Sequence, residues 1–159
     1  MNRQLLEEML NLMAKTLKEG GDVGDLKIGA LFALGSQLEA IFYFCGHELA
    51  SKLEVGRASS NEMKSVVNAL KDAATRYHLG ELVPLRVESS SVTFELRDCS
   101  SCRKLVGVST ETTYCAFEAG LFAGLVEKIT GGDHAFAQEI VCKCQGHPAC
   151  QFMVVLQDS

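Results

Sequence analysis

The sequence predicts an α+β fold, with an antiparallel sheet of about four strands packed with about four helices. Apolar residues recur at helical spacing through the first half of the chain and again at about 114–129. Between residues 82 and 97, and again after residue 133, apolar and polar residues alternate, as they do in half-buried strands. Helices therefore gather in the first half and strands mostly in the second, which is the order typical of an α+β domain.

Three helices are predicted before the first strand. The stretch 3–18 carries an apolar stripe and is followed by a glycine pair that can end a helix. A second helix, from about residue 25 to residue 49, is apolar around much of its circumference, so we expect it to be central. A third helix follows the capping-box sequence of residues 59–62. We expect this helical part, residues 3–79, to belong to the same single domain as the rest of the chain, 1–159.

Two β-hairpins are predicted after residue 80. The first joins strands near 83–87 and 92–96, and Pro84 places its first strand at a sheet edge because proline has no N–H to donate. The second joins strands at about 134–144 and 149–157. Together they make an antiparallel sheet of about four strands.

The helix predicted between the hairpins carries small residues at close spacing. Gly120 and Gly124 lie four residues apart, with alanines beside them. Small residues let another backbone come near, so we expect this helix to pack tightly on the sheet or on the second helix. A dimer contact is the alternative.

Composition excludes several classes of protein. The chain has 159 residues, 47% of them apolar, which is enough for the core of one domain. The net charge is −5 and no basic run occurs, so nucleic acid is not an expected partner. No apolar run is long enough for a membrane span, and the first ten residues lack the apolar centre of a secretory signal. We therefore expect a cytoplasmic protein, in which seven cysteines would not form a disulfide framework.

Four residues of the last third could bind a metal ion. Cys142 and Cys150 flank the turn of the second hairpin, Glu139 precedes Cys142 by three residues, and Cys115 begins the helix at 114–129. Thiolates with one carboxylate suit tetrahedral zinc, which is a borderline-soft ion. Buried cysteines that act as small apolar residues are the alternative.

The spacing of these residues raises a conflict. In a regular strand, Glu139 and Cys142 point to opposite faces. A β-bulge between them would bring both to one face, or Cys144 could replace Glu139 as a ligand. The Cys99-x-x-Cys102 pair could also complete a four-cysteine site with the two cysteines of the hairpin, or act as a redox dithiol.

The segment 114–152 carries a chain of motifs in a fixed order. It reads Cys-x-Phe-x-x-Gly-x-x-x-Gly on the predicted helix, then Glu-x-x-Cys, then Gly-x-Pro-x-Cys-x-Phe in the hairpin. In this order the segment resembles the 4-vinyl reductase domain family. The resemblance implies a fold similar to the TRAPP vesicle-tethering subunits and to the sensory domains of bacterial regulators that bind phenol and other aromatic hydrocarbons.

The resemblance also implies a set of metal ligands. In related sensors a helix cysteine, a glutamate and two hairpin cysteines hold zinc, and the matching residues are Cys115, Glu139, Cys142 and Cys150. Four protein ligands leave no open position for water, so the zinc would be structural. The chain has no tryptophan, unlike those sensors, and their phenol-contacting residues cannot be carried over.

We expect a sensor or carrier domain that binds a small hydrophobic or aromatic ligand and forms a homodimer. The candidate pocket residues, any of which could belong to the core instead, are Phe32, Phe42, His47, Phe94, Phe117 and Phe122. The alternatives are a reductase of a vinyl or other unsaturated group and a scaffold or assembly subunit. A reductase needs a hydride or electron source, and the sequence has no Gly-x-Gly-x-x-Gly fingerprint or iron–sulfur run, so binding is favoured over catalysis.

Overall fold

The computed structural model describes residues 39–60, 62–104 and 113–157, together with residues 7, 10, 11, 14, 15, 17–20 and 24. The described positions from 7 to 18 are helical, and Leu10, Ala14 and Leu17 are buried in the core. The part of the predicted second helix between residues 25 and 38, including the pocket candidate Phe32, lies outside the described residues.

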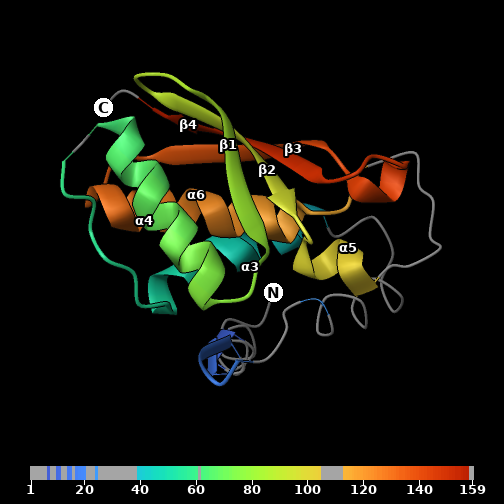
Figure 1. The fold of residues 1–159 in the computed structure, drawn as a ribbon. Helices are drawn as coiled ribbons and strands as arrows, with labels where there is room; N and C mark the ends of the chain where they lie inside the picture. The colour runs from blue at the N-terminus through green and yellow to red at the C-terminus, as the bar shows by residue number, and fades with distance from the viewer. Residues whose placement is uncertain are drawn as a thin grey trace.

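One four-stranded antiparallel sheet forms the upper layer of the molecule in Figure 1. Its strands are β1 (Glu81–Val87), β2 (Ser91–Arg97), β3 (Ala135–Val141) and β4 (Cys150–Leu156). They lie in the order β1-β2-β4-β3, so β1 is an edge strand, as Pro84 predicts. The two predicted hairpins are therefore neighbours, joined through the pairing of β2 with β4.

Helices cover one face of this sheet. The described helices are α3 (Glu39–Lys52), α4 (Met63–Arg76), α5 (Ser100–Lys104) and α6 (Ala116–Thr130). Figure 1 shows α4 and α6 below the sheet and α3 beyond α6, so the α+β class is confirmed. Within the described ranges, no helix combines the length and the apolar character that a membrane crossing requires.

The start of α4 differs from the prediction. Its N-cap residue is Glu62, and no side-chain cap hydrogen bond forms there, so the predicted capping box is wrong. The hydroxyl of Ser65, in the first turn, instead accepts the backbone N–H groups of Ser59 (3.0 Å) and Ser60 (3.4 Å). These bonds hold the preceding segment against the helix from inside the first turn.

Helices α3 and α6 lie in close contact, and glycines make the contact possible. A Cβ atom added at Gly120 would lie 1.9 Å from the backbone oxygen of Tyr43, and one added at Gly46 would lie 2.0 Å from that of Phe117. The small residues of α6 therefore serve close packing on the second predicted helix, which is one of the two partners that the sequence suggests.

Aromatic side chains fill the core between α6 and the sheet. Phe94, Phe122 and Phe152 are fully buried, with ring centroids 5.0 to 5.7 Å apart. Two of the three pairs meet edge to face, a geometry that aromatic pairs favour. This cluster anchors β2 and β4 over α6 and so holds the end of the sheet where the cysteines gather.

Candidate metal centre

Six thiols converge at one end of the sheet. All seven cysteines lie in the described part of the chain, and each is a buried free thiol. Those that lie in the cluster are Cys99, Cys102, Cys115, Cys142, Cys144 and Cys150. The seventh, Cys45, lies on α3 and belongs to no group of potential ligands among the described residues.

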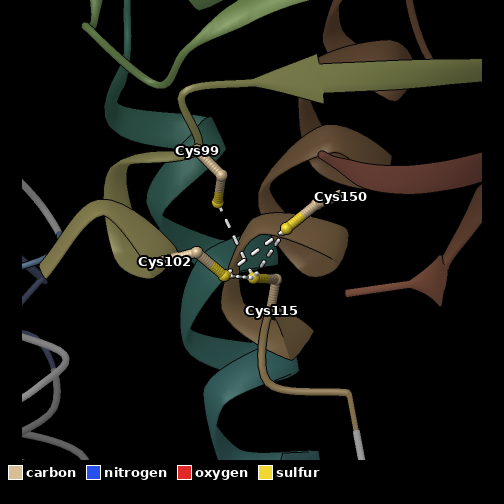
Figure 2. Close-up of side chains that lie close together, drawn as sticks. All are labelled: Cys99, Cys102, Cys115 and Cys150. Atoms are coloured by element: carbon tan, nitrogen blue, oxygen red, sulfur yellow. Dashed lines mark hydrogen bonds between the residues drawn. The ribbon is translucent and has the colours of Figure 1, made fainter. Parts of the chain in front are cut away.

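Four elements bring sulfur atoms to this point, as Figure 2 shows. Cys99 directly follows β2, where Asp98 adopts a left-handed backbone (φ 52°) that turns the chain into α5. Cys102 lies on α5, Cys115 is the N-cap residue of α6, and Cys150 is the first residue of β4. The site therefore joins segments that lie far apart in the sequence.

A bulge places the remaining two groups. The register of β3 against β4 shifts between Glu139 and Val141, which is the irregularity that the spacing of Glu139 and Cys142 requires. Both side chains are buried, with 5% and 0% exposure. After Cys142, the chain forms the 3-10 turn η2 (Lys143–Gln145) that leads back toward β4.

The distances between sulfur atoms match the shell of a single ion. Cys102 Sγ lies 3.4 Å from Cys115 Sγ, 3.4 Å from Cys150 Sγ and 3.7 Å from Cys142 Sγ. Cys115 Sγ and Cys150 Sγ are 3.8 Å apart. Tetrahedral zinc with bonds of about 2.3 Å to sulfur separates its ligands by about 3.8 Å. The donors therefore fit zinc in both chemistry and spacing.

Three overlapping groups of potential ligands share these atoms. The predicted set, Cys115, Glu139, Cys142 and Cys150, is brought together with all ligand atoms within 4.8 Å of one another. A second group is Cys99, Cys102, Cys115 and Cys150, and a third is Cys102, Cys142 and Cys144. The Cys99-x-x-Cys102 pair thus joins the cluster, as one alternative from the sequence suggests, and it shares a group with Cys115 as well as Cys150.

Electrostatics around Glu139 favour a cation. Its Oε2 accepts the backbone N–H of Cys115 at 2.7 Å, whereas Oε1 is buried and has no hydrogen-bond partner. Burial, followed by the negative charge of Cys142, raises the pKa of this carboxyl to about 8. A hydrogen bond from Cys102 in turn holds the pKa of the Cys142 thiol well below its usual range. A positive ion would stabilise both anionic forms at once.

A cleft of about 670 Å³ adjoins the cluster. It lies between the first turn of α3, the start of α6 and β3, and Glu139 forms part of its wall. Two aromatic residues of the wall, Tyr43 and Phe136, stack with centroids 5.8 Å apart, and the Tyr43 hydroxyl accepts the N–H of Ala137. Sequence patterns did not single out this aromatic pair, because an aromatic residue at a cleft looks the same in sequence as one in a core.

The predicted pocket residues lie elsewhere. Phe94, Phe117 and Phe122 are fully buried and line none of the clefts found in the described part of the chain. Phe42 is partly buried against the core. Contact of these residues with a ligand stays a prediction.

His47 lies at a different cleft, of about 430 Å³, near the C-terminal end of α6. Its Nε2 is 3.1 Å from a carboxylate oxygen of Glu127, whose other oxygen accepts the N–H of Ala135 at 3.0 Å. The histidine is thus tied to the link between α6 and β3, and its contact with a ligand also stays a prediction.

Three solved structures share this architecture. The phenol-responsive sensory domain of the transcription activator PoxR, solved with phenol, matches with a TM-score of 0.62 at 18% identity, covering 84% of this chain and 72% of that chain. A vinyl-4-reductase family protein from Methanocaldococcus jannaschii matches with a TM-score of 0.60 at 21% identity, covering 99% and 98%. Trafficking protein particle complex subunit 3 from Naegleria fowleri, covalently bound to palmitic acid, has a TM-score of 0.57 at 16% identity and covers 96% and 97%.

Sequence comparison identifies the family. An uncharacterized protein from Methanocaldococcus jannaschii is 34% identical over 135 residues, which cover 84% of this chain and 73% of that protein. The family model of the 4-vinyl reductase domain matches residues 92–156, the part that runs from β2 to β4 and contains α5, α6 and the thiol cluster. The motifs, the fold and these matches together lead to one conclusion: the chain belongs to the 4-vinyl reductase domain family.

Proposed function

We propose that this protein is a sensor-type domain that binds a small aromatic or hydrophobic molecule, with a structural zinc ion held by Cys115, Glu139, Cys142 and Cys150. The observation that carries the proposal is the position of Glu139, which belongs both to the thiol cluster and to the wall of the adjacent cleft. Zinc at this point would hold the end of β3 against the start of α6 and so define the shape of the cleft.

The cleft has the properties of a ligand site. Its volume of about 670 Å³ falls within the range of small-molecule pockets. Apolar contact would come from Tyr43, Phe136 and the alanines of α6, while Glu39 and Glu139 offer polar atoms at the rim and floor. The sensory domain of PoxR, which shares the fold, was solved with phenol, so phenol is the aromatic probe of choice.

The zinc has a structural role in this proposal. Four protein ligands complete a tetrahedral shell and leave no position for a reacting water. The protein would therefore bind and report a molecule without converting it, which separates the proposal from the reductase alternative. A redox cofactor that co-purifies with the protein would favour the reductase instead.

Calorimetry with phenol tests the ligand site. We expect zinc-loaded protein to bind phenol, and Ala40→Phe, which fills the cleft from α3, to abolish the binding. Thr75→Phe is the matched control, since Thr75 lines a separate cleft beside β1. Zinc-loaded wild type that takes up no phenol, or an Ala40→Phe variant that binds it unchanged, would contradict this site.

Two further properties belong to the same proposal. Reduced thiols are needed for a zinc–thiolate site, so we place the protein in the cytoplasm. We also propose a homodimer formed through α3, where Ile41 and Phe44 are 44% and 43% exposed. Light scattering of wild type and of Phe44→Glu checks the dimer, because a charge in that interface should yield the monomer.

A further inference from the structure

We propose that the thiol cluster binds a second zinc ion, held by Cys99 and Cys102, with Cys115 and Cys150 shared between the two ions. The inference rests on the proposed function, because the first ion is the one assigned to Cys115, Glu139, Cys142 and Cys150. It extends that site by a loop and a short helix, the segment Cys99–Cys102.

The number of donors exceeds what one ion can use. A tetrahedral zinc takes four ligands, whereas six sulfur atoms and one carboxylate meet at this point. Cys99 is fully buried and Cys102 is 5% exposed. Moreover, Cys102 Sγ lies among other sulfur atoms, within 3.4 Å of Cys115, Cys144 and Cys150. A cysteine that serves only as a small apolar residue would be expected to pack mainly against carbon.

The two groups of four share one edge. Cys115 and Cys150 belong to both groups, and their sulfur atoms are 3.8 Å apart, which equals the edge of a zinc–thiolate tetrahedron of about 3.8 Å. Cys99 and Cys102 complete one tetrahedron on this edge. Their own distances to Cys115, 3.7 and 3.4 Å, are of the same size. Two ions that share two thiolates therefore account for six of the seven donors.

The charge of the cluster permits both ions. One zinc with three thiolates and one carboxylate has a net charge of −2. Two zinc ions with five thiolates and one carboxylate have the same net charge, because the second ion replaces the thiol protons of Cys99 and Cys102, which leave to solvent. The second ion thus adds no net charge to a buried site, which is the condition that burial imposes.

The remaining thiol has a different position. Cys144 Sγ donates a hydrogen bond to Cys102 Sγ at 3.4 Å, so it can support a ligand thiolate without binding an ion. Spacing also speaks for single ions over an iron–sulfur cluster. In such a cluster each cysteine binds a different iron, and the sulfide ions between the irons would hold cysteine sulfur atoms farther apart than 3.4 to 3.8 Å.

Metal counting on the full chain tests the proposal. We expect native mass spectrometry of wild type purified with zinc to show two ions per chain, with one ion in Cys99→Ser and one in Cys142→Ser. Cys45→Ala and Cys144→Ser are the matched controls, because these buried cysteines lie outside the proposed ligand set, and each should keep two.

The outcomes separate this proposal from the preceding one. A single ion that is lost in Cys142→Ser and kept in Cys99→Ser would overturn the second site and leave the first. A single ion lost in Cys99→Ser and kept in Cys142→Ser would overturn both assignments, as would a protein without metal or with the visible absorption of an iron–sulfur cluster.

Cobalt substitution tests the shared ligands. Two cobalt ions joined by bridging thiolates couple magnetically, so the electron paramagnetic resonance signal per ion should be weaker in wild type than in Cys99→Ser. Equal signals per ion would show two independent sites and overturn the bridging roles of Cys115 and Cys150.

Discussion

Glu139 connects the metal cluster with the cleft through a single side chain. One carboxylate oxygen is fixed by the Cys115 N–H at 2.7 Å, while the other is buried without a partner. A buried acid without full compensation lowers the stability of a fold, and the pKa of about 8 expresses that cost. Such a residue is explained when it has a partner that appears only with a bound cation.

Replacing Glu139 with Gln should separate its two roles. The amide oxygen can still accept the Cys115 N–H, but the negative charge is lost. We expect zinc affinity to fall by at least about 10-fold, measured by competition with a chromogenic chelator. The exposed Glu88→Gln is the control and should bind zinc as wild type does. Unchanged affinity in Glu139→Gln would remove Glu139 from the ligand set.

Gly120 shows how a single hydrogen atom in place of a side chain sets a helix contact. A Cβ atom there would lie 1.9 Å from the Tyr43 backbone oxygen, and a backbone atom cannot rotate away as a side chain can. We expect Gly120→Ala to lower the free energy of unfolding by about 3 kcal/mol, since α3 and α6 must separate. Urea denaturation measures this loss.

The control for that prediction is Gly56→Ala. Nothing lies within 4 Å of a Cβ atom at Gly56, so the free energy of unfolding should change by no more than about 0.5 kcal/mol. Equal effects of the two substitutions would contradict the close packing of α3 on α6.

At the scale of elements, the short segments around the cluster have little support of their own. Helix α5 has five residues and η2 has three, too few for stable isolated helices. Arg103 pairs with Asp98 at 2.8 Å, and Ser101 donates a hydrogen bond to the buried carboxylate of Glu118. The thiols of Cys102 and Cys142 tie both segments to the start of β4, so a bound ion should stabilise these segments most.

Removing zinc should therefore loosen one end of the molecule. With chelator, we expect the melting temperature to fall by about 8 °C or more, which corresponds to the loss of an ion present well above its dissociation constant. Hydrogen exchange should accelerate in α5, η2 and the start of β4, and stay slow in α4, which is the internal control. Uniform acceleration across all four elements would contradict a local role for the metal.

At the scale of the whole molecule, the fold places a cleft and a metal cluster on opposite ends of one short strand segment. The wall of the cleft includes Gln138 and Glu139 of β3, and the bulge that follows brings Cys142 into the cluster. The cleft and the cluster therefore share backbone as well as Glu139. Ordering one should order the other, which is a coupling between two binding sites.

This coupling leads to a prediction for the intact protein. Phenol should bind the zinc-free protein at least about 5-fold more weakly than the zinc-loaded protein, as calorimetry on both forms would measure. The Cys45→Ala variant, loaded with zinc, should retain the stronger binding because Cys45 lies outside the cluster. Equal affinity in both forms would show that the ion does not shape the cleft.

The sequence by itself determined the elements and their order. Helical and alternating patterns are local, so they predicted α6 and the two hairpins, and Pro84 predicted the edge position of β1. The spacing of Glu139 and Cys142 predicted a bulge, because the side-chain period of a strand left no other way to bring both to one face. Helix α5 was missed, since five residues are too few to show a period.

Only the tertiary structure decided which donors and which walls meet. Cys99 and Cys102 join Cys115 and Cys150 because β2 pairs with β4 and the turn at Asp98 directs α5 beneath the start of α6. Likewise, the cleft beside Tyr43 depends on the distance between α3 and β3. Both arrangements result from packing between segments far apart in the chain, and local sequence patterns do not carry the free energy of such contacts.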